Sequence, residues 1–442
     1  MQKPSTALPI FKKLAPNERI EKRISVALVG YGRQGELIIG TLPRIPGVHI
    51  ASIADIWPWR RELAKNRLRA LRLSPNLYET LDEMLHAEGD KIDAVIIATP
   101  DWQHFNHVSA CLKANKPVYC DGEISDSSVK ALELVTLAGD KKLLVQCGHQ
   151  RRSNPQYRYA IETLHRKYMI PNYCTHAYTQ WHRGIIPLIH VPNRFAMPTV
   201  DLQRHGYENM EQLLNWEWFG RFGLGDVAYR TGQKLDVLRW FWDAEPVSVT
   251  SLGSNDYYNR EAIDFLMSIF TFKLPNGQLR RGYVQVLSTN SCRGEHELFS
   301  GLIASEYNPD KMRIVRVGCT LCYDDSEIAM QEGIGVYNMA EIPYTNLKKA
   351  NDDQVLEWEN NKGLCHAFSH LDKKSMPLYG AHCLKIPIQG YSPPIHPHLE
   401  NFISAIRDGA KLRDPIEQAT KNLIALEAAV QSARERRTID LV

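Results

Sequence analysis

The sequence lacks the features that mark proteins of membranes, of the export pathway or of nucleic acids. No apolar run is long and uncharged enough to span a bilayer. Residues 1–23 mix basic residues with prolines and have no apolar core like that of a signal peptide. The 53 Lys and Arg nearly balance the 50 Asp and Glu, and the basic residues form no stripe. We therefore predict a cytoplasmic protein whose partners include neither a membrane nor a nucleic acid.

The sequence also has few cysteines, and their pattern does not indicate a disulfide framework. Nine cysteines make an odd number, and they are spread thinly from Cys111 to Cys383, which favours reduced thiols over disulfides. Cys319 and Cys322 have a spacing that suits a metal, but no second ligand pair lies near enough for a structural zinc site. We predict buried thiols and no metal. Repeats and low-complexity segments are absent as well.

What the chain does have is the length and pattern of two domains. Its 442 residues exceed one compact core, and 44% of them are hydrophobic. From Ile24 to about Gly148, short β-rich runs alternate with helical stretches, as in a parallel sheet with crossover helices. The expected strands are Ile24–Val29, Val48–Ala54, Ala94–Ala98, Val118–Cys120 and Leu143–Cys147. The expected helices are Gly35–Leu42, Trp59–Leu71, Phe105–Ala114 and Ser127–Ala138.

After Gly148 the pattern changes to longer strands with turn signals, which predicts an open, mostly antiparallel sheet. Its expected strands are Asn172–Trp181, Val247–Leu252, Phe265–Leu274, Gln278–Leu287 and Met312–Val317, with a hairpin turn at Pro275-Asn276-Gly277. Asp414 is the expected N-cap of the last helix, with Pro415 at its first position and Glu417 completing a capping box. Residues 340–394 are expected to form loops with short elements.

The predicted fold class is therefore α/β, with a doubly wound parallel sheet of the Rossmann type followed by an α/β domain with a large open sheet. We expect an N-terminal extension over residues 1–23 and a dinucleotide-binding domain over residues 24–150. A domain for substrate binding and oligomerisation then covers residues 151–442, including the closing helices.

A glycine-rich turn joins the first expected strand to the first expected helix. Glycines at 30, 32 and 35 allow backbone N–H groups to approach a pyrophosphate at the helix N-terminus. Asp55 ends the next strand, where a carboxylate accepts hydrogen bonds from the ribose hydroxyls of NAD and repels the 2′-phosphate of NADP. We predict NAD rather than NADP. Arg60 and Arg61 could meet a phosphate, but a solvated helix face is the simpler interpretation.

A second loop at the carboxyl edge of the sheet, Ala98–His104, is expected to line the cofactor. Thr99 and His104 could instead cap the following helix, and both interpretations stay open for His104. The predicted cofactor-binding residues are Gly30, Tyr31, Gly32, Arg33, Gln34, Gly35, Asp55, Thr99, Pro100, His104 and Asp121.

With these motifs the chain resembles the Gfo/Idh/MocA family of NAD(P)-dependent oxidoreductases from about Ile24 to the C-terminal helix. Besides the glycine turn, the resemblance is carried by Ala98-Thr99-Pro100 with His104, Lys116–Cys120, Val145–Ser153, Leu235-Asp236-Val237 before Trp240, and His398–Phe402 followed by Ala405-Ile406-Arg407. The resemblance implies a Rossmann domain, a second domain with a large open sheet, and a sugar or cyclic polyol between them. It also implies a homo-oligomer.

The chain departs from the family pattern at two reactive positions. Active dehydrogenases of the family carry a Glu-Lys-Pro triplet whose lysine orients substrate and shuttles a proton, and here the triplet is Asp121-Gly122-Glu123. The family also places a histidine three residues before the aspartate that Asp236 matches, and here that position is Gln233. Because an amide cannot act as a base near neutrality, acid–base work must come from another group or not occur.

Several residues are candidates for that group. His182, at the end of an expected strand, is the best candidate base if it faces the nicotinamide, and the alternative is a surface or packing histidine. Asp121 and Glu123, beside Asp236, form a second candidate set, with solvated loop charge as the alternative. Lys234 is expected to face away from Gln233 and Asp236. The predicted catalytic residues are His182, Asp236, Asp121 and Glu123, and the predicted substrate-binding residues are Tyr178, Trp181, Arg183, Gln233 and Asp236.

Two functions from different classes follow. The first is an NAD-dependent enzyme that acts on a sugar, polyol or glycoside, either as a dehydrogenase or by transient oxidation during glycoside cleavage. The second is a non-catalytic member that binds NAD and a sugar as a sensor or partner subunit, which the losses at Gly122 and Gln233 favour. A purely structural role would leave the glycine turn and Asp55 unexplained.

Overall fold

The computed structural model describes residues 22–158, 161–162, 174–182, 193–258, 260–289, 295–304, 314–321, 335–339, 381–384 and 395–441. Between residues 295 and 384 it describes the backbone, together with the side chain of Glu297. Within these ranges, no helix has the length and apolar character needed to cross a membrane.

The N-terminal half forms a six-stranded, all-parallel sheet in the order β3-β2-β1-β4-β5-β6. Its strands are β1 Ile24–Val29, β2 Val48–Ala54, β3 Asn76–Tyr78, β4 Ala94–Ile97, β5 Val118–Cys120 and β6 Val145–Cys147. Its helices are α1 Arg33–Thr41, α2 Pro58–Ala70, α3 Leu81–Glu88, α4 His104–Lys113 and α5 Ser128–Lys141. Short 3-10 turns at η1 Leu42–Arg44, η2 Gly89–Lys91 and η3 Asp101–Gln103 complete it.

Both faces of this sheet are covered by helices, which explains the near-continuous apolar runs of its strands. In β1, Val26 and Leu28 pack into a core with α1 and α2, whereas Ala27 and Val29 pack into the core on the opposite face. The α12 helix, Ile395–Asp408, joins the first of these cores through Leu399. A C-terminal helix thus completes a domain that begins near residue 24.

The second sheet has nine strands in the order β14-β13-β12-β11-β7-β10-β9-β8-β15. Only the β7–β10 pair is parallel, and the other pairs are antiparallel. The strands are β7 Cys174–His182, β8 Pro246–Ser254, β9 Phe265–Lys273, β10 Leu279–Leu287, β11 Glu295–Ala304, β12 Ile314–Leu321, β13 Gly335–Met339, β14 Ala381–Leu384 and β15 Ile439–Asp440.

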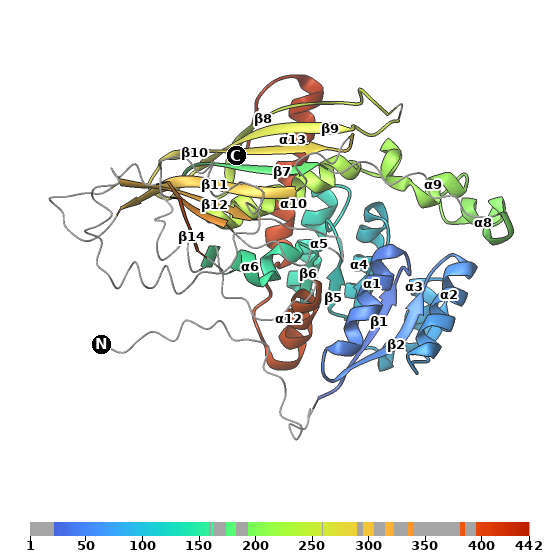
Figure 1. Ribbon diagram of the computed structural model, residues 1–442. Coiled ribbons are helices and arrows are strands. Elements are labelled where there is room, and N and C mark those ends of the chain that lie inside the picture. Colours follow the sequence, from blue (N-terminus) through green and yellow to red (C-terminus); the bar gives the residue numbers. More distant parts are fainter. Residues whose placement is uncertain are drawn as a thin grey trace, which may run out of the picture.

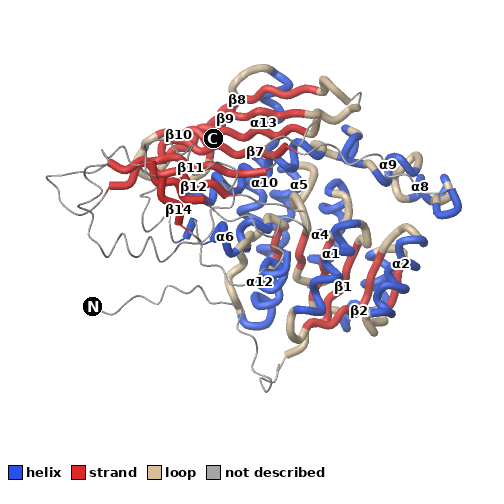
Figure 2. The backbone as a smooth tube through the Cα atoms, in the orientation of Figure 1, coloured by secondary structure: helices blue, strands red, loops and turns tan. Residues whose placement is uncertain are grey.

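Two long helices, α10 Asp226–Trp242 and α13 Ile416–Glu435, pack on one face of this sheet, between it and the Rossmann domain (Figures 1 and 2). Alternation in β10 turns Val284 and Val286 toward these helices. The same core contains residues of β4, β5 and α4, so the two domains share one continuous apolar interior. Between them lie η4 Gln150–Ser153 and α6 Pro155–Arg158.

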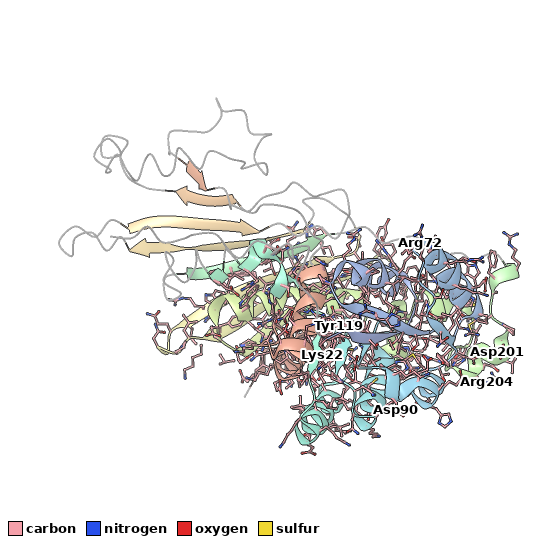
Figure 3. All side chains as sticks on the ribbon, turned by 90° about the horizontal axis from the view of Figure 1, so that it is seen from below. Lys22, Arg72, Asp90, Tyr119, Asp201 and Arg204 are labelled. Atoms are coloured by element: carbon pink, nitrogen blue, oxygen red, sulfur yellow. The ribbon has the colours of Figure 1, made fainter. Side chains whose placement is uncertain are left out.

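A helical segment, residues 193–222, leaves the second domain and crosses to the Rossmann domain (Figure 1). It contains η7 Asn193–Phe195, α8 Thr199–Arg204, α9 Met210–Leu214, η8 Trp216–Trp218 and η9 Gly220–Phe222. In Figure 3, Asp201 and Arg204 lie at the outer end of this segment, far from the central Tyr119. We call residues 193–222 the crossing segment.

The crossing segment is fixed at the carboxyl ends of three strands. After β2, Trp57 Nε1 donates to the carbonyl oxygen of Phe195 at 2.7 Å. After β3, Glu79 pairs with His205 at 3.2 Å. After β4, the ring of Trp102 packs edge-on against that of Tyr207, with 5.6 Å between ring centres. Because β1 lies between β2 and β4, the crossing segment spans the end of the strand that leads into the glycine turn.

The predicted fold class is confirmed, and β1, β2 and β5 have the predicted bounds. The predicted hairpin turn is also present, with Gly277 at φ +81° and its N–H donating to Leu274. The capping prediction for the last helix was wrong. Its N-cap is Pro415, and Asp414 makes no cap because its carboxylate binds His149. The expected strand Met312–Val317 coincides with β12 from Ile314 onward, whereas its residues 312 and 313, and most of residues 340–394, lie outside the described ranges.

Candidate functional site

The glycine turn lies where β1 meets α1, at the carboxyl edge of the parallel sheet. Gly30 has φ +92°, and a Cβ on it would come within 2.5 Å of the carbonyl oxygen of Ala98. A Cβ on Gly35 would collide with the carbonyl oxygen of Gly30. Gly32 is different, because no atom lies within 4 Å of the position that its Cβ would take. Two glycines therefore permit the turn itself, and the third leaves open space beside the helix N-terminus.

The side chains of this turn take different positions. Tyr31 is buried in the Rossmann core, and burial raises the pKa of its phenol. Arg33 is exposed at the N-terminus of α1, and Gln34 is half-buried beside it. The open space next to Gly32 is therefore bordered by backbone N–H groups and polar side chains, which suits a phosphate group.

Asp55 stands at the end of β2 and faces the glycine turn. One of its oxygens accepts from the backbone N–H of Tyr31 at 2.7 Å and the other from that of Trp57 at 2.8 Å. Burial raises the pKa of Asp55, and these two N–H groups together with Arg60 and Arg61 oppose the rise. Each carboxylate oxygen keeps a lone pair for a further donor, such as a ribose hydroxyl.

The loop after β4 carries Thr99, Pro100 and His104. His104 is fully buried, and its two ring nitrogens lie 2.7 Å from the carbonyl oxygen of Glu123 and 2.8 Å from that of Thr99. The ring thus joins this loop to the β5–α5 loop. Thr99 Oγ1 lies 3.0 Å from Nδ1 of His107. Each ring nitrogen of His104 therefore contacts a backbone carbonyl oxygen, and neither nitrogen points to open space.

The β5–α5 loop holds Asp121, Gly122 and Glu123. Asp121 accepts hydrogen bonds from Tyr119 at 2.9 Å and from Gln150 at 3.1 Å. Gly122 has φ +102° and carries no side chain. Glu123 is 2% exposed, and its carboxylate packs directly against Gly232 of α10. A side chain at Gly232 would displace it, which explains a glycine within a long helix.

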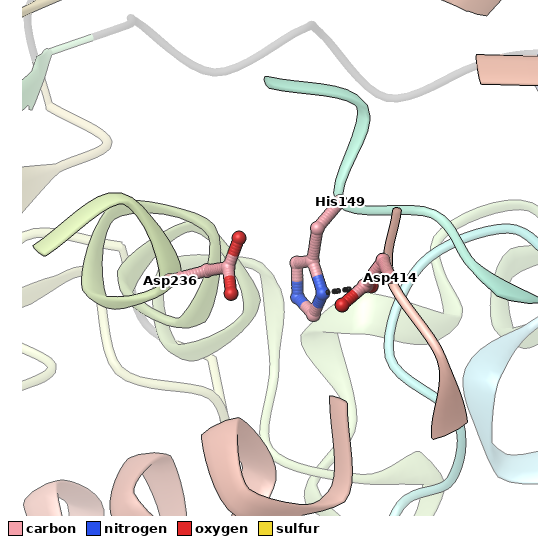
Figure 4. Close-up of side chains that lie close together, drawn as sticks. All are labelled: His149, Asp236 and Asp414. Atoms are coloured by element: carbon pink, nitrogen blue, oxygen red, sulfur yellow. Dashed lines mark hydrogen bonds and ion pairs between the residues drawn. The ribbon is translucent and has the colours of Figure 1, made fainter. Parts of the chain in front are cut away.

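His149, Asp236 and Asp414 form a buried group between the two domains (Figure 4). His149 donates from Nδ1 to Asp414 at 2.7 Å, and its Nε2 lies 3.3 Å from Glu123. Burial alone would lower the pKa of His149, but Asp414, Asp236 and Glu123 outweigh it and hold the pKa well above its usual range. The imidazole is therefore a cation among carboxylates.

Arg152 binds Asp236 from the same group. Its Nε and Nη2 contact the two carboxylate oxygens at distances from 2.7 to 3.0 Å. Burial raises the pKa of Asp236, but Arg152, His149 and Arg239 outweigh it and lower the pKa to about 2. The His149, Asp236 and Asp414 ligand atoms lie within 4.8 Å of one another, yet Arg152 already occupies Asp236 and balances its charge without an ion.

Gln233 and Lys234 point to different surroundings on α10. Gln233 is half-buried and accepts from Arg151 at 3.1 Å. Lys234 is fully buried and donates to Glu297 of β11 at 2.7 Å. Lys234 therefore faces the second sheet, away from Gln233 and Asp236 as expected from the helix period.

Of the residues predicted at the end of β7, Tyr178 and His182 are not brought to Asp236. Alternation places Tyr178 and His182 on the same face of the sheet, opposite the face that α10 covers. The hydroxyl of Tyr178 lies within 2.8 Å of side-chain oxygens of Gln180 and Gln285 on that outer face. His182 is half-buried at the strand end. The side chain of Trp181 and all of Arg183 lie outside the described residues.

Two carboxyl groups with raised pKa values, that of Asp101 beside Gly122 and that of Glu217, did not figure among the predicted site residues. Asp101 begins η3, within the loop that the sequence assigned to the cofactor. Glu217 belongs to the crossing segment, between two tryptophans. Its position gives no local signal, since the approach of the crossing segment to the Rossmann domain is a long-range event.

A helical N-terminus with an open glycine, and a carboxylate at the next strand end, together define a dinucleotide-binding protein of the Rossmann class. Residues 24–149 match the model of an oxidoreductase family with an NAD-binding Rossmann fold. Over these residues the chain is thus similar to the NAD-binding domain of the Gfo/Idh/MocA oxidoreductases.

Relatives in sequence match the same part of the chain. An inositol 2-dehydrogenase of Rubrobacter xylanophilus is 33% identical over 138 residues, which are 31% of this chain and 38% of that protein. The 4-carboxy-2-hydroxymuconate-6-semialdehyde dehydrogenase of a Sphingobium species is 31% identical, over 30% of this chain and 41% of that protein. The chain thus matches less than half of the length of these relatives.

Solved structures resemble the whole fold. The aldose-aldose oxidoreductase of Caulobacter crescentus, complexed with glycerol, has a TM-score of 0.66 at 14% identity, covering 95% of this chain and 100% of that one. A levoglucosan dehydrogenase in complex with NADH has a TM-score of 0.65 at 14% identity, with the same coverage. At this identity the likeness establishes the shared two-domain fold.

Proposed function

We propose that this protein is an NAD-dependent oxidoreductase that acts on a carbinol of a sugar, polyol or glycoside. The observation that carries the proposal is the open space at Gly32 beside the N-terminus of α1, faced by the Asp55 carboxylate. The names of the relatives support the substrate class, since they include an inositol 2-dehydrogenase and an aldose-aldose oxidoreductase. The same site serves a net dehydrogenation or a transient oxidation during glycoside cleavage.

The residues present fit a dinucleotide. A Cβ at position 32 would fill the space that the pyrophosphate needs, and its absence leaves the N–H groups of α1 accessible. Asp55 would hold the ribose hydroxyls, and the Thr99-Pro100 loop would lie along the cofactor. When bound, NAD supplies the acceptor for the hydride of the carbinol carbon.

NAD is favoured over NADP by the surroundings of Asp55. Its carboxylate is placed by two backbone N–H groups, and a 2′-phosphate in front of it would meet a like charge. Arg60 does not take a position dedicated to a phosphate, because its guanidinium lies 5.6 Å from the ring centre of Trp57 and 5.1 Å from that of Trp59.

Calorimetry with NAD and NADP, followed by a panel of sugars, polyols and glycosides with detection of NADH and of altered sugar, tests the proposal. Micromolar binding of NAD with turnover of one substrate class is the expected result. Binding of NAD without any product across the panel would favour a sensor or partner subunit, and no binding at millimolar NAD would refute the proposal.

The outer face of the second sheet supports a homo-oligomer. Leu252, Met267, Ile269 and Tyr283 expose 65%, 42%, 42% and 39% of their surface there. An exposed apolar patch of this kind on a β-sheet is typical of a protein interface. Light scattering should show more than one chain per particle, and Met267→Glu should reduce that mass if this face is the contact.

A further inference from the structure

One face of α10 is less deeply buried than the rest of the helix. The residues that keep part of their surface are Asp226, Arg230, Gln233 and Trp240, and their spacing of four, three and seven places them on one side of the helix. Near one end of this face Asp226 pairs with Arg230 at 3.2 Å. Near the other end the Arg152 guanidinium lies 5.8 Å from the ring centre of Trp240. Gln233 lies between these two contacts.

The contact with Arg151 fixes the direction of the Gln233 amide. Arg151 Nη1 donates to Gln233 Oε1 at 3.1 Å, and a guanidinium carries no acceptor. The amide oxygen must therefore face Arg151, because the opposite orientation would set two donors against each other. No residue in the described part of the chain accepts a hydrogen bond from the amide nitrogen. Gln233 is half-buried and this nitrogen is not enclosed, so a ligand can reach the donor.

Other polar groups at this contact between the domains are enclosed or already bound. Glu123 Oε2 and Asp414 Oδ1 accept no hydrogen bond within the described residues, but both atoms are buried from solvent. The Asp236 carboxylate is bound by Arg152, and Lys234 is fully buried against the second sheet. Unlike these groups, Gln233 combines a partly open position with a donor whose direction is fixed.

The proposed dinucleotide site places the reactive end of NAD toward Gln233. Asp55, at the end of β2, is the expected partner of the adenosine ribose, and the pyrophosphate lies at the glycine turn after β1. The nicotinamide half then extends to the other side of β1, over the carboxyl ends of β4, β5 and β6. Arg151 follows β6, and Gly232, next to Gln233, packs on Glu123 in the loop after β5. The Gln233 amide therefore lies at the nicotinamide end of the site.

We propose that Gln233 donates a hydrogen bond to the oxygen on the substrate carbon that exchanges a hydride with NAD, and that Arg151 positions the amide for this. The inference rests on the proposed function. In the oxidation, the O–H bond breaks, its proton passes to water, and its electron pair stays on the oxygen. The C–H bond then breaks with both of its electrons, the hydride leaves for NAD⁺, and the oxygen pair forms the second carbon–oxygen bond.

The oxygen carries negative charge between these two events, and a fixed N–H donor stabilises that charge. An amide neither takes up nor releases a proton near neutral pH, so Gln233 acts as a donor in both directions of the reaction. In the reduction, the same N–H polarises the carbonyl group before the hydride arrives. Arg151 does not touch the substrate, and its part is to keep the amide from turning over.

Two substitutions separate this role from packing. Gln233→Glu keeps the length of the side chain and an oxygen for Arg151 but presents an acceptor in place of the donor, and Gln233→Met removes both. On the substrate found in the panel, each variant should lose about 100-fold or more in kcat, while the Kd for NAD changes by less than about twofold. Gln203→Met is the matched control, because Gln203 is exposed in α8 and should keep full activity. Full activity in Gln233→Glu would overturn the proposal, because that variant preserves the contact with Arg151.

A double-mutant cycle tests the positioning by Arg151. Arg151→Met should lower kcat about tenfold in the parent, since the amide can then turn, and should have little further effect in Gln233→Met, where no amide remains. Equal losses in both backgrounds would refute the positioning role. If Arg151→Met does not fold, because Arg151 also lies 3.6 Å from the buried Glu297, the Gln233 variants still decide the proposal.

The two proposals fail in different ways. If NAD binds but nothing in the panel reacts, the oxidoreductase proposal fails, and the inference about Gln233 fails with it. If a substrate reacts and both Gln233 variants keep the kcat of the parent, the inference about Gln233 fails alone.

Discussion

Glu217→Gln should make the protein more stable at neutral and alkaline pH, in contrast to most substitutions of a half-buried residue. Burial and the Asp226 charge raise the pKa of this carboxyl group from 4.5 to about 7 in the folded protein. Each pH unit between the unfolded and folded pKa corresponds to about 1.4 kcal/mol. The full shift therefore amounts to a penalty of up to about 3 kcal/mol, reduced by solvent at the exposed part of the side chain.

The sign follows from proton binding. Between pH 4.5 and about 7 the folded state keeps the Glu217 proton that the unfolded state has lost, so the free energy of unfolding falls as pH rises. Above pH 7 the penalty is complete, and below pH 4.5 it is absent. Glutamine resembles the protonated acid and carries no such dependence.

Urea unfolding of parent and variant over a series of pH values measures the effect. The difference in the free energy of unfolding should be near zero at about pH 4 and reach up to about 3 kcal/mol in favour of Glu217→Gln at about pH 8. Glu211→Gln, at an exposed position of the crossing segment, should show no such trend. A difference that is independent of pH would refute the reasoning, because it would mean that Glu217 titrates alike in the folded and unfolded states.

Three further predictions concern the cofactor turn and the buried ion pair. Gly32→Ala should raise the Kd for NAD about tenfold or more with little effect on unfolding, because its methyl group enters the space for the pyrophosphate. Gly35→Ala should instead lower Tm, because its methyl group collides with the backbone. Calorimetry measures the first effect and thermal unfolding the second, and equal Tm values for the two variants would contradict this explanation. Asp55→Asn should weaken the binding of NAD and bring the Kd values for NAD and NADP closer together. An unchanged ratio of the two Kd values would argue against Asp55 as the residue that selects NAD. Arg152→Met should cost about 3–5 kcal/mol in the free energy of unfolding, because the buried Asp236 carboxylate loses its hydrogen-bonded guanidinium. The double variant with Asp236→Leu should regain most of this loss, and no recovery in urea unfolding would count against the pairing.

Much of the Rossmann domain could be predicted because strands that are buried on both faces appear in the sequence as continuous apolar runs. The β1 run is covered on both faces and reads as continuous apolar sequence, so its bounds agree with the prediction. The β3 strand was missed because Asn76–Tyr78 is three residues long at the edge of the sheet and only partly buried. The α3 helix that follows is short as well, at eight residues.

The capping signal at the last helix misled for a different reason. Asp414, Pro415 and Glu417 have the local spacing of a helix start, and the helix does begin there. The Asp414 carboxylate, however, binds His149, which lies 265 residues away in sequence. A partner at that separation cannot be read from a local pattern.

In the candidate site, too, contacts between residues close in sequence could be predicted, and contacts between residues far apart in sequence could not. The glycine turn and Asp55 are contained in one βαβ unit, so their spacing in sequence already encodes their proximity. Arg152 and Asp236 lie 84 residues apart in the sequence, and His149 and Asp414 lie 265 residues apart. For such pairs the sequence shows the residue types, and only the packed domains show which groups meet.

The crossing segment has a kinetic consequence. It is fixed after β2, β3 and β4, on both sides of the strand that leads into the glycine turn. A dinucleotide seated in that turn would lie beneath it, so we expect the residence time of NAD to follow the opening of this segment. Slow dissociation of the cofactor does not reduce the turnover rate of an enzyme that regenerates NAD within each catalytic cycle. It would limit the turnover rate of an enzyme that must release NADH after every cycle. The dissociation rate of NADH, compared with kcat, would distinguish the two kinds of reaction.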